Sequence, residues 1–232
     1  MRYLFIALLP FCINSCLQTA DKIPVNPASP ELNFSSGRSY LEIKDSIVMN
    51  RKRLSAKYSS LNRESGEITD FWIDNISIGL YSQWQNTPWD FNGTTEKPNE
   101  GAIACGYFVT TILRDMDLKI NRNKLAVCAS SIMMKTLAPQ QKIKNLSYLN
   151  YAAFNDTLKK LGKGVYIIGL DFHTGFIVND GKENWFIHSN YIKRKGVTKE
   201  TVNNSAALRS SRTRWLISLT SDRDFVGHWL KG

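Results

Sequence analysis

The segment HTGFIVNDGKENWFIH, residues 173–188, decides the fold of the middle of this chain. Residues 172–178 and 183–189 are rich in aromatic and β-branched side chains, which fit the pleated surface of a β-strand. Between them lies an Asp-Gly pair at 180–181, which is typical of a two-residue type I′ turn. We therefore predict a β-hairpin over this segment.

The turn also predicts which side chains meet. With Asp180 and Gly181 at the centre of the turn, His173 is placed directly opposite His188, and Asp171 opposite Asn190. Opposite residues share one face of a hairpin, with their Cβ atoms about 5 Å apart. The chain has only three histidines, so the alignment of two of them predicts half of a catalytic or binding site.

The composition predicts one globular domain. The chain has 232 residues, of which 43% are hydrophobic and 11% aromatic, and it carries a formal net charge of +10. This content is too apolar for a disordered chain. Because the basic residues are spread out and no nucleic-acid motif is present, we expect a solvated basic surface and no nucleic-acid partner.

The N-terminus has the pattern of an export signal. Residues 1–16 read MRYLFIALLPFCINSC, with Arg2 before an apolar run that is too short to span a bilayer. The run ends in a segment similar to a bacterial lipobox, which predicts lipid attachment at Cys16 and a membrane anchor. The alternative is simple cleavage that releases a soluble secreted protein. Residues 17–37, with three prolines, read as a linker, which leaves 38–232 as the folded domain.

Hydrophobic periodicity predicts further elements around the hairpin. Residues 84–101, with two Trp and two Pro, read as an irregular loop. The predicted helices are 38–62, 68–83, 121–135, 147–161 and 221–230, and the predicted strands are 165–170 and 214–219. We expect Cys128 on the core side of the helix 121–135 and Ser147 as the N-cap of the helix 147–161.

Cys105 is the candidate nucleophile. Val109, Ile112, Leu113 and Met116 follow a helical period, which places Cys105 at the first turn of a helix. The free N–H groups and the dipole of a helix N-terminus stabilise a thiolate and lower the pKa of a thiol. The alternative is a small buried hydrophobic residue.

The sequence gives little sign of a metal or a cofactor. It has no phosphate-binding loop, no CxxC and no HExxH motif. Two histidines and one cysteine do not complete a zinc site unless Asp171 joins them. We expect no cofactor, a surface or packing role for His228, and no disulfide between Cys105 and Cys128.

Three segments carry a resemblance to a known family. They are Cys-Gly-Tyr-Phe-Val at 105–109, His-Thr-Gly-Phe-Ile at 173–177 and Ile-His-Ser at 187–189. In this order they resemble the NlpC-type cell-wall cysteine peptidases of the papain-like superfamily. The resemblance implies an α+β fold whose cysteine-bearing helix packs on a small antiparallel sheet, with the N-terminal helices as an addition to that core.

The resemblance also implies roles for the site residues. Cys105 would be the nucleophile, His173 the general base and His188 the residue that orients His173, with Asp171 or Asn190 as the alternative third member. The oxyanion would be bound by the Cys105 N–H and by a donor from the loop 84–92. Ala104 departs from the family, which usually has Asp there, and Gly-Tyr at 106–107 replaces the usual Ser-Gly.

These expectations combine into one function. The chain would be an exported, lipid-anchored, monomeric thiol hydrolase of the bacterial cell envelope, periplasmic or on the outer membrane. It would cleave an amide bond in a peptidoglycan stem peptide, either a γ-D-glutamyl or the muramoyl-L-alanine link. Two alternatives stay open, a non-catalytic wall-binding lipoprotein on the same fold and a thiol transpeptidase or acyltransferase.

Overall fold

The structure, a computed structural model, describes residues 37–58 and 66–232. The predicted signal, the lipidation site Cys16 and all but the last residue of the predicted linker lie outside this part. Within the described residues, no helix has the length and apolar character needed to cross a bilayer.

The described domain is built around a six-stranded sheet in the order β1-β6-β2-β3-β4-β5, in which every neighbouring pair is antiparallel. Together with the helices this makes the domain α+β, as predicted. Sequence periodicity predicted β2, β3, β4 and β6 but neither β1 nor β5. The strands are β1 (Lys144–Asn145), β2 (Gly164–Gly169), β3 (Thr174–Asn179), β4 (Asn184–Asn190), β5 (Gly196–Thr201) and β6 (Trp215–Ser218).

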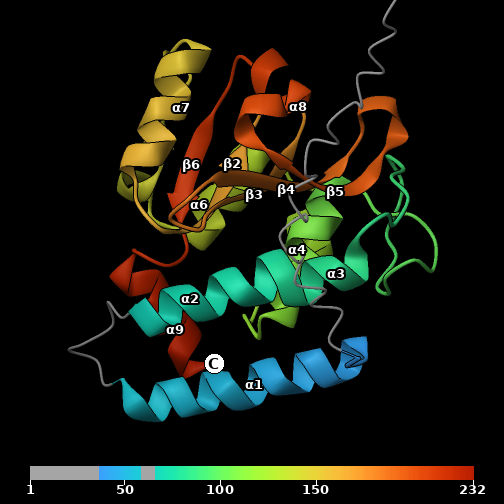
Figure 1. Cartoon of the computed structure of the whole chain (residues 1–232), viewed down its shortest axis with the longest axis vertical. Coiled ribbons are helices and arrows are strands. Elements are labelled where there is room, and N and C mark those ends of the chain that lie inside the picture. Colours follow the sequence, from blue (N-terminus) through green and yellow to red (C-terminus); the bar gives the residue numbers. More distant parts are fainter. Residues whose placement is uncertain (1–36, 59–65) are drawn as a thin grey trace, which may run out of the picture. The chain divides into compact units, whose positions relative to one another are not determined.

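The helices lie on both sides of this sheet (Figure 1). A π-helical stretch, η1 (Asn75–Leu80), joins α2 to α3, and short 3₁₀ turns occur at η2 (Gln140–Lys142), η3 (Ile192–Arg194) and η4 (Val202–Asn204). The α-helices are α1 (Tyr40–Lys57), α2 (Gly66–Asp74), α3 (Tyr81–Trp84), α4 (Cys105–Asp115), α5 (Arg122–Ala126), α6 (Ser130–Leu137), α7 (Tyr151–Lys160), α8 (Ala206–Ser210) and α9 (Arg223–Lys231).

Two hydrophobic cores hold the layers together. Helices α2, α4 and α6 pack on one face of the sheet, with α1 farther out against η1 and α9, and α7 and α8 pack on the other face (Figure 1). Successive residues of β2 point into different cores: Ile167 lies in the core shared with α2 and α4, and Ile168 in the core shared with α7 and α8. Because β2 is covered on both faces, its sequence is a continuous apolar run.

The predicted helix 121–135 is two helices in the structure. Helix α5 ends at Ala126 and α6 begins at Ser130, so Cys128 lies in the break and not on the core side of a helix. Gly106 lets these segments approach, because a Cβ at that position would overlap the carbonyl oxygen of Ala126. The prediction for Cys128 was therefore wrong, since the close packing of α5 on α4 is not visible in the periodicity.

The predicted helix 147–161 also begins later than expected. The N-cap of α7 is Asn150, whose side chain accepts a 2.9 Å hydrogen bond from the Ala153 N–H. Ser147 instead accepts a hydrogen bond from the Arg214 N–H, which joins the approach to α7 to the approach to β6. Ser147 and Asn150 are both suitable N-caps, and the hydrogen bond between Ser147 and the distant Arg214 leaves Asn150 as the cap.

The hairpin forms, but its register differs from the prediction. Phe176 pairs with Ile187, and the turn has Gly181 and Lys182 at its centre, of which only Gly181 has a positive φ. The carboxylate of Asp180 accepts the N–H groups of Lys182 and Glu183, both at 2.8 Å, and this stabilises the later turn. The type I′ turn was therefore wrong.

The change of register keeps every side chain on its predicted face. The shift moves each pairing by two residues, which is one full pleat repeat. His188 consequently lies across from Gly175 and diagonal to His173, while both histidines stay on the same face. The direct opposition of His173 and His188 was wrong, and so was the opposition of Asp171 and Asn190, but the contact between the histidines was right.

Candidate active site

The two histidines of the hairpin touch. Nε2 of His173 lies 2.7 Å from Nδ1 of His188, and the rings are 5% and 0% exposed. Phe186 stacks on His188 at 4.0 Å, and Tyr191 meets the ring of His173 edge-on at 5.0 Å. The pair is thus held by aromatic packing on the sheet face that α7 and α8 cover.

Gly175 makes room for this pair. A Cβ at Gly175 would lie 2.8 Å from the Cβ of His188 and 2.6 Å from the ring of Phe186. Real Cβ atoms essentially never approach so closely, so any side chain at this position would push His188 and Phe186 aside. The glycine between the two strands is therefore part of the site.

Glu200 extends the pair to a third group. It lies on β5, and its Oε1 is 3.3 Å from Nε2 of His188. Burial acts to raise the pKa of Glu200, but hydrogen bonds from His188 and Ser205 outweigh it and lower the pKa. Sequence reasoning missed Glu200 because no strand was predicted there, although Thr198 and Glu200 alternate as in a strand next to His188.

Cys105 comes to the same end of the sheet from the other face. It is the first residue of α4, and its sulfur accepts a hydrogen bond from the backbone N–H of Thr174, the residue after His173. Ser189 anchors the approach to α4 with a 2.6 Å hydrogen bond to the carbonyl of Ile103. The thiol therefore lies beside the residue that follows the imidazole, but no hydrogen bond joins Cys105 to the ring of His173 in the described structure.

Both groups are neutral in this environment. Burial raises the pKa of the Cys105 thiol, although the N–H groups of Thr174, Gly106 and Cys105 itself act in the opposite direction. Burial and the charge of His188 hold the pKa of His173 well below its usual value, and burial lowers the pKa of His188 despite Glu200. The helix N-terminus was expected to lower the thiol pKa overall, and this was wrong because desolvation is the larger effect.

The two alternative third members of the site have other roles. The carboxylate of Asp171 accepts the backbone N–H groups of Arg212 and Thr213, both at 2.8 Å. The side-chain oxygen of Asn190 accepts the N–H of Ile192 at 2.9 Å. Both side chains thus stabilise turns, and their hydrogen bonds do not reach His173.

A small cleft opens beside His173. It has a volume of about 170 Å³, and Leu170, Phe172, Tyr191 and Ser211 are among its lining residues. Phe172 is 98% exposed and stands at the rim. A substrate chain that enters this cleft would meet an aromatic rim and the imidazole of His173.

The Trp-rich loop reaches the rim of the site. Trp89 packs against Tyr191 with ring centroids 6.3 Å apart, and the guanidinium of Arg194 lies over Trp89. This loop was expected to supply a second oxyanion donor. The N–H groups of Asn86 and Thr87 bind the carbonyls of Val197 and Trp84, so these two are already used.

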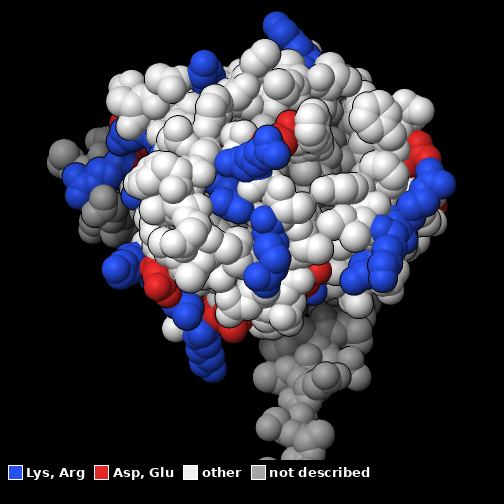
Figure 2. Space-filling model, turned by 90° about the horizontal axis from the view of Figure 1, so that it is seen from above, with Lys and Arg blue, Asp and Glu red and all other residues white. Residues whose placement is uncertain are grey.

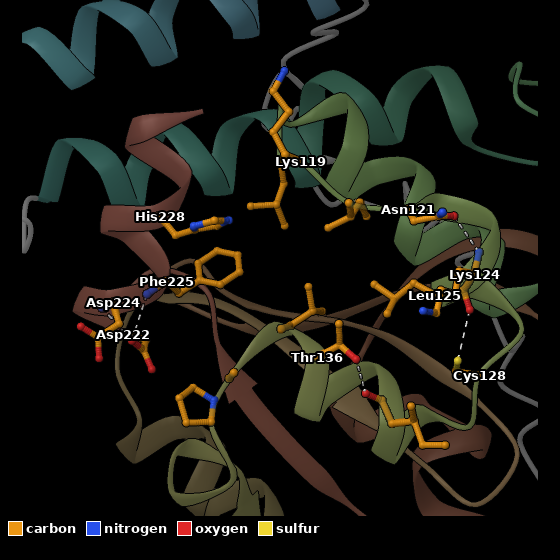
Figure 3. Close-up of a pocket in the computed structure, with 16 residues that line it drawn as sticks. Lys119, Asn121, Lys124, Leu125, Cys128, Thr136, Asp222, Asp224, Phe225 and His228 are labelled. Atoms are coloured by element: carbon orange, nitrogen blue, oxygen red, sulfur yellow. Dashed lines mark hydrogen bonds between the residues drawn. The ribbon is translucent and has the colours of Figure 1, made fainter.

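A larger cavity lies elsewhere, between α5, α6 and α9 (Figure 3). It measures about 490 Å³ and is mainly apolar, and the side chains of Phe225 and His228 point into it from α9. Cys128 stands at its edge, and its thiol donates a hydrogen bond to the Lys124 carbonyl. Neither Cys105 nor the histidine pair lines this cavity, so its size does not make it the catalytic site.

The described residues have further properties that concern metal binding, thiols and surface charge. They contain no group of three or more His, Cys, Asp or Glu side chains that could hold a metal ion, and Cys105 and Cys128 are both free thiols. Lys and Arg side chains stand in separate groups over the face that Figure 2 shows, not in one dense patch. On this face the basic charge is thus distributed.

Comparison with models of protein families, with curated proteins and with solved structures gave no match for this chain.

Proposed function

We propose that the chain is a papain-like cysteine hydrolase that cleaves an amide bond in peptidoglycan peptides. One observation carries the proposal. Cys105 opens a buried helix, and its sulfur meets the amide of the residue that follows His173, while His188 holds the ring of His173 at 2.7 Å. A nucleophile, a base and a group that orients the base are the components of thiol catalysis. Their order along the chain is that of the NlpC-type peptidases it resembles.

We propose the following reaction for these residues. Nδ1 of His173 would take the proton of the Cys105 thiol as the sulfur attacks the substrate carbonyl, and the Cys105 N–H at the start of α4 would receive the oxyanion. The imidazolium then gives its proton to the leaving amine, which leaves a thioester on Cys105. Water, deprotonated by His173, attacks the thioester, releases the acid and restores the thiol.

The neutral resting state places the proton transfer after substrate binding. A Cys105 thiol with a raised pKa and a buried neutral His173 imidazole do not form an ion pair at neutral pH. A bound substrate that brings the Cys105 thiol and the His173 imidazole into hydrogen-bond contact would start the transfer, because catalytic hydrogen bonds often form only in the substrate complex.

The location and the substrate class rest on the sequence. Residues 1–37 read as an export signal with a lipid-modified Cys16 and a linker, which would hold the domain at a bacterial membrane facing the wall. The net charge of +10 favours association with an anionic wall polymer.

Digestion of purified muropeptides by the chain, followed by mass spectrometry of the products, tests the proposal. We expect one amide bond to be cleaved by the unmodified protein and by Cys128→Ala, and not by Cys105→Ala or His173→Ala. Cys128 is the matched control because it is the other free thiol of the described domain. Intact muropeptides after incubation with the unmodified protein would reject the proposal.

A non-catalytic wall-binding protein is the second candidate function. The raised pKa of Cys105 and the lack of a hydrogen bond between its sulfur and His173 favour it. Co-sedimentation with peptidoglycan sacculi separates the two candidates. Binding that is equal in the unmodified protein and Cys105→Ala, without cleavage of any muropeptide, would support the binding role.

A further inference from the structure

The contact between the two imidazoles does not by itself say which of them donates the hydrogen bond. Each neutral imidazole carries one proton on one of its two nitrogens, so a single proton lies between Nε2 of His173 and Nδ1 of His188. If His173 donates, its Nδ1 is a free base. If His188 donates, Nδ1 of His173 carries the proton and cannot accept one from a thiol.

Glu200 decides between these two arrangements. An ionised carboxylate only accepts hydrogen bonds, so the nitrogen of His188 that faces Glu200 must carry a proton. That nitrogen is Nε2, and with its one proton there, Nδ1 of His188 is an acceptor. His173 must then donate through Nε2, which leaves its Nδ1 unprotonated.

We infer that Glu200 is a positioning residue that fixes the tautomers of His188 and His173 and so keeps Nδ1 of His173 available as the base. The inference rests on the proposed function for its catalytic consequence, but the tautomers themselves require no substrate. Glu200 lies two strands away from His173 and acts through His188 alone.

The surroundings of Glu200 fit a permanent acceptor. Its side chain is 16% exposed, and Ser205 donates a second hydrogen bond to it. The charge of Lys195 also favours the ionised form of the Glu200 carboxylate. The carboxylate in turn helps to raise the pKa of the nearby Tyr151 phenol. With this support, Glu200 is ionised at neutral pH and serves as the fixed end of the chain of hydrogen bonds.

Nuclear magnetic resonance of the full chain with ¹⁵N-labelled histidine tests the inference. Two-bond proton–nitrogen correlations report which ring nitrogen carries the proton. We expect Nε2–H tautomers for both His173 and His188 in the unmodified protein. In Glu200→Ala we expect His188 to lose this preference, and in Glu200→Gln, whose amide oxygen still accepts, we expect most of it to return. Glu183→Ala, a glutamate of the hairpin turn, is the control and leaves both tautomers unchanged.

Hydrolysis rates provide the second readout. We expect kcat to fall roughly tenfold or more in Glu200→Ala, because proton transfer by a positioned base contributes about 10²–10⁴-fold in total, and to recover in Glu200→Gln. An Nδ1–H tautomer of His173 in the unmodified protein overturns the inference, as do unchanged tautomers in Glu200→Ala. If no muropeptide is cleaved while the tautomers follow Glu200, the proposed function fails and the tautomer control stands.

Discussion

Nε2 of His173 and Nδ1 of His188 are 2.7 Å apart, and neither ring has appreciable contact with solvent. Such a contact holds a single proton between the rings. It is lost when both imidazoles become doubly protonated, because two N–H donors would then face each other. The two imidazoles are therefore buried in their neutral form in the folded protein, and their protonation at acidic pH breaks the hydrogen bond between them.

The first prediction concerns stability against pH. The pKa values of His173 and His188 are lowered in the folded state, so below the ordinary histidine pKa the unfolded chain binds more protons. The free energy of unfolding should fall as the pH drops below about 6.5, by roughly 1–3 kcal/mol per pH unit while both groups differ. Urea denaturation between pH 5 and 8 measures this slope.

A double variant, His173→Asn with His188→Asn, should flatten that pH dependence whatever its own stability. The control is His228→Ala, which removes an exposed histidine and should keep the steep slope. The same slope in the double variant and in the unmodified protein would show that other groups cause the acid sensitivity.

The second prediction concerns the reactivity of Cys105. Because burial raises the pKa of its thiol, alkylation by iodoacetamide should be slow at pH 7 and should accelerate toward alkaline pH. Mass spectrometry of the digested protein follows Cys105 and Cys128 in the same sample, and we expect Cys128 to react first at neutral pH. Rapid modification of Cys105 below pH 7 would instead demonstrate a thiolate in the resting protein and contradict the neutral state of the Cys105 thiol.

The third prediction concerns Gly175. An added methyl group in Gly175→Ala would meet His188 and Phe186 below 3 Å and displace the imidazole pair. We expect loss of muropeptide hydrolysis and a destabilisation of about 1–3 kcal/mol from overpacking. Circular dichroism melting and product analysis measure the two effects. Unchanged hydrolysis in a folded Gly175→Ala protein would mean that the position of His188 does not matter.

The fourth prediction concerns Gly106, which follows Cys105. A Cβ there would overlap the Ala126 carbonyl, so Gly106→Ala should separate α5 from α4 and destabilise the domain by about 1–3 kcal/mol. Gly66→Ala is the matched control, because a Cβ at Gly66 has no neighbour within 4 Å. Equal unfolding midpoints of the two variants in urea would contradict the close packing.

Sequence reasoning found the hairpin, the helix that begins at Cys105 and the shared face of the two histidines. These depend on local patterns, namely alternation, helical period and turn residues. It misplaced the turn because Asp180 can take part in two turns, and only its hydrogen bonds to the following N–H groups distinguish them. The predicted face survived because a two-residue shift restores it.

Other features depend on contacts between distant segments. The side chain of Glu200 contacts His188 from a strand of six residues in which Val197 is the one aliphatic residue, so the alternation was too weak to predict a strand. The raised pKa of Cys105 reflects burial by the whole domain, whereas the sequence revealed only the helix N-terminus. Local patterns thus predicted four of the six strands and the shared face of the histidines, and tertiary packing set the register of the hairpin and the charge state of Cys105.

Trapping the covalent intermediate tests the central claim most directly. Purified muropeptides are mixed with the full chain, the reaction is quenched in acid within its first turnovers, and the intact mass is measured. The proposal predicts a mass increase equal to the acyl part of the substrate, located on the peptide that contains Cys105, present in Cys128→Ala and absent in Cys105→Ala and His173→Ala. A muropeptide that is cleaved without any adduct at Cys105, or cleaved equally by Cys105→Ala, would contradict it.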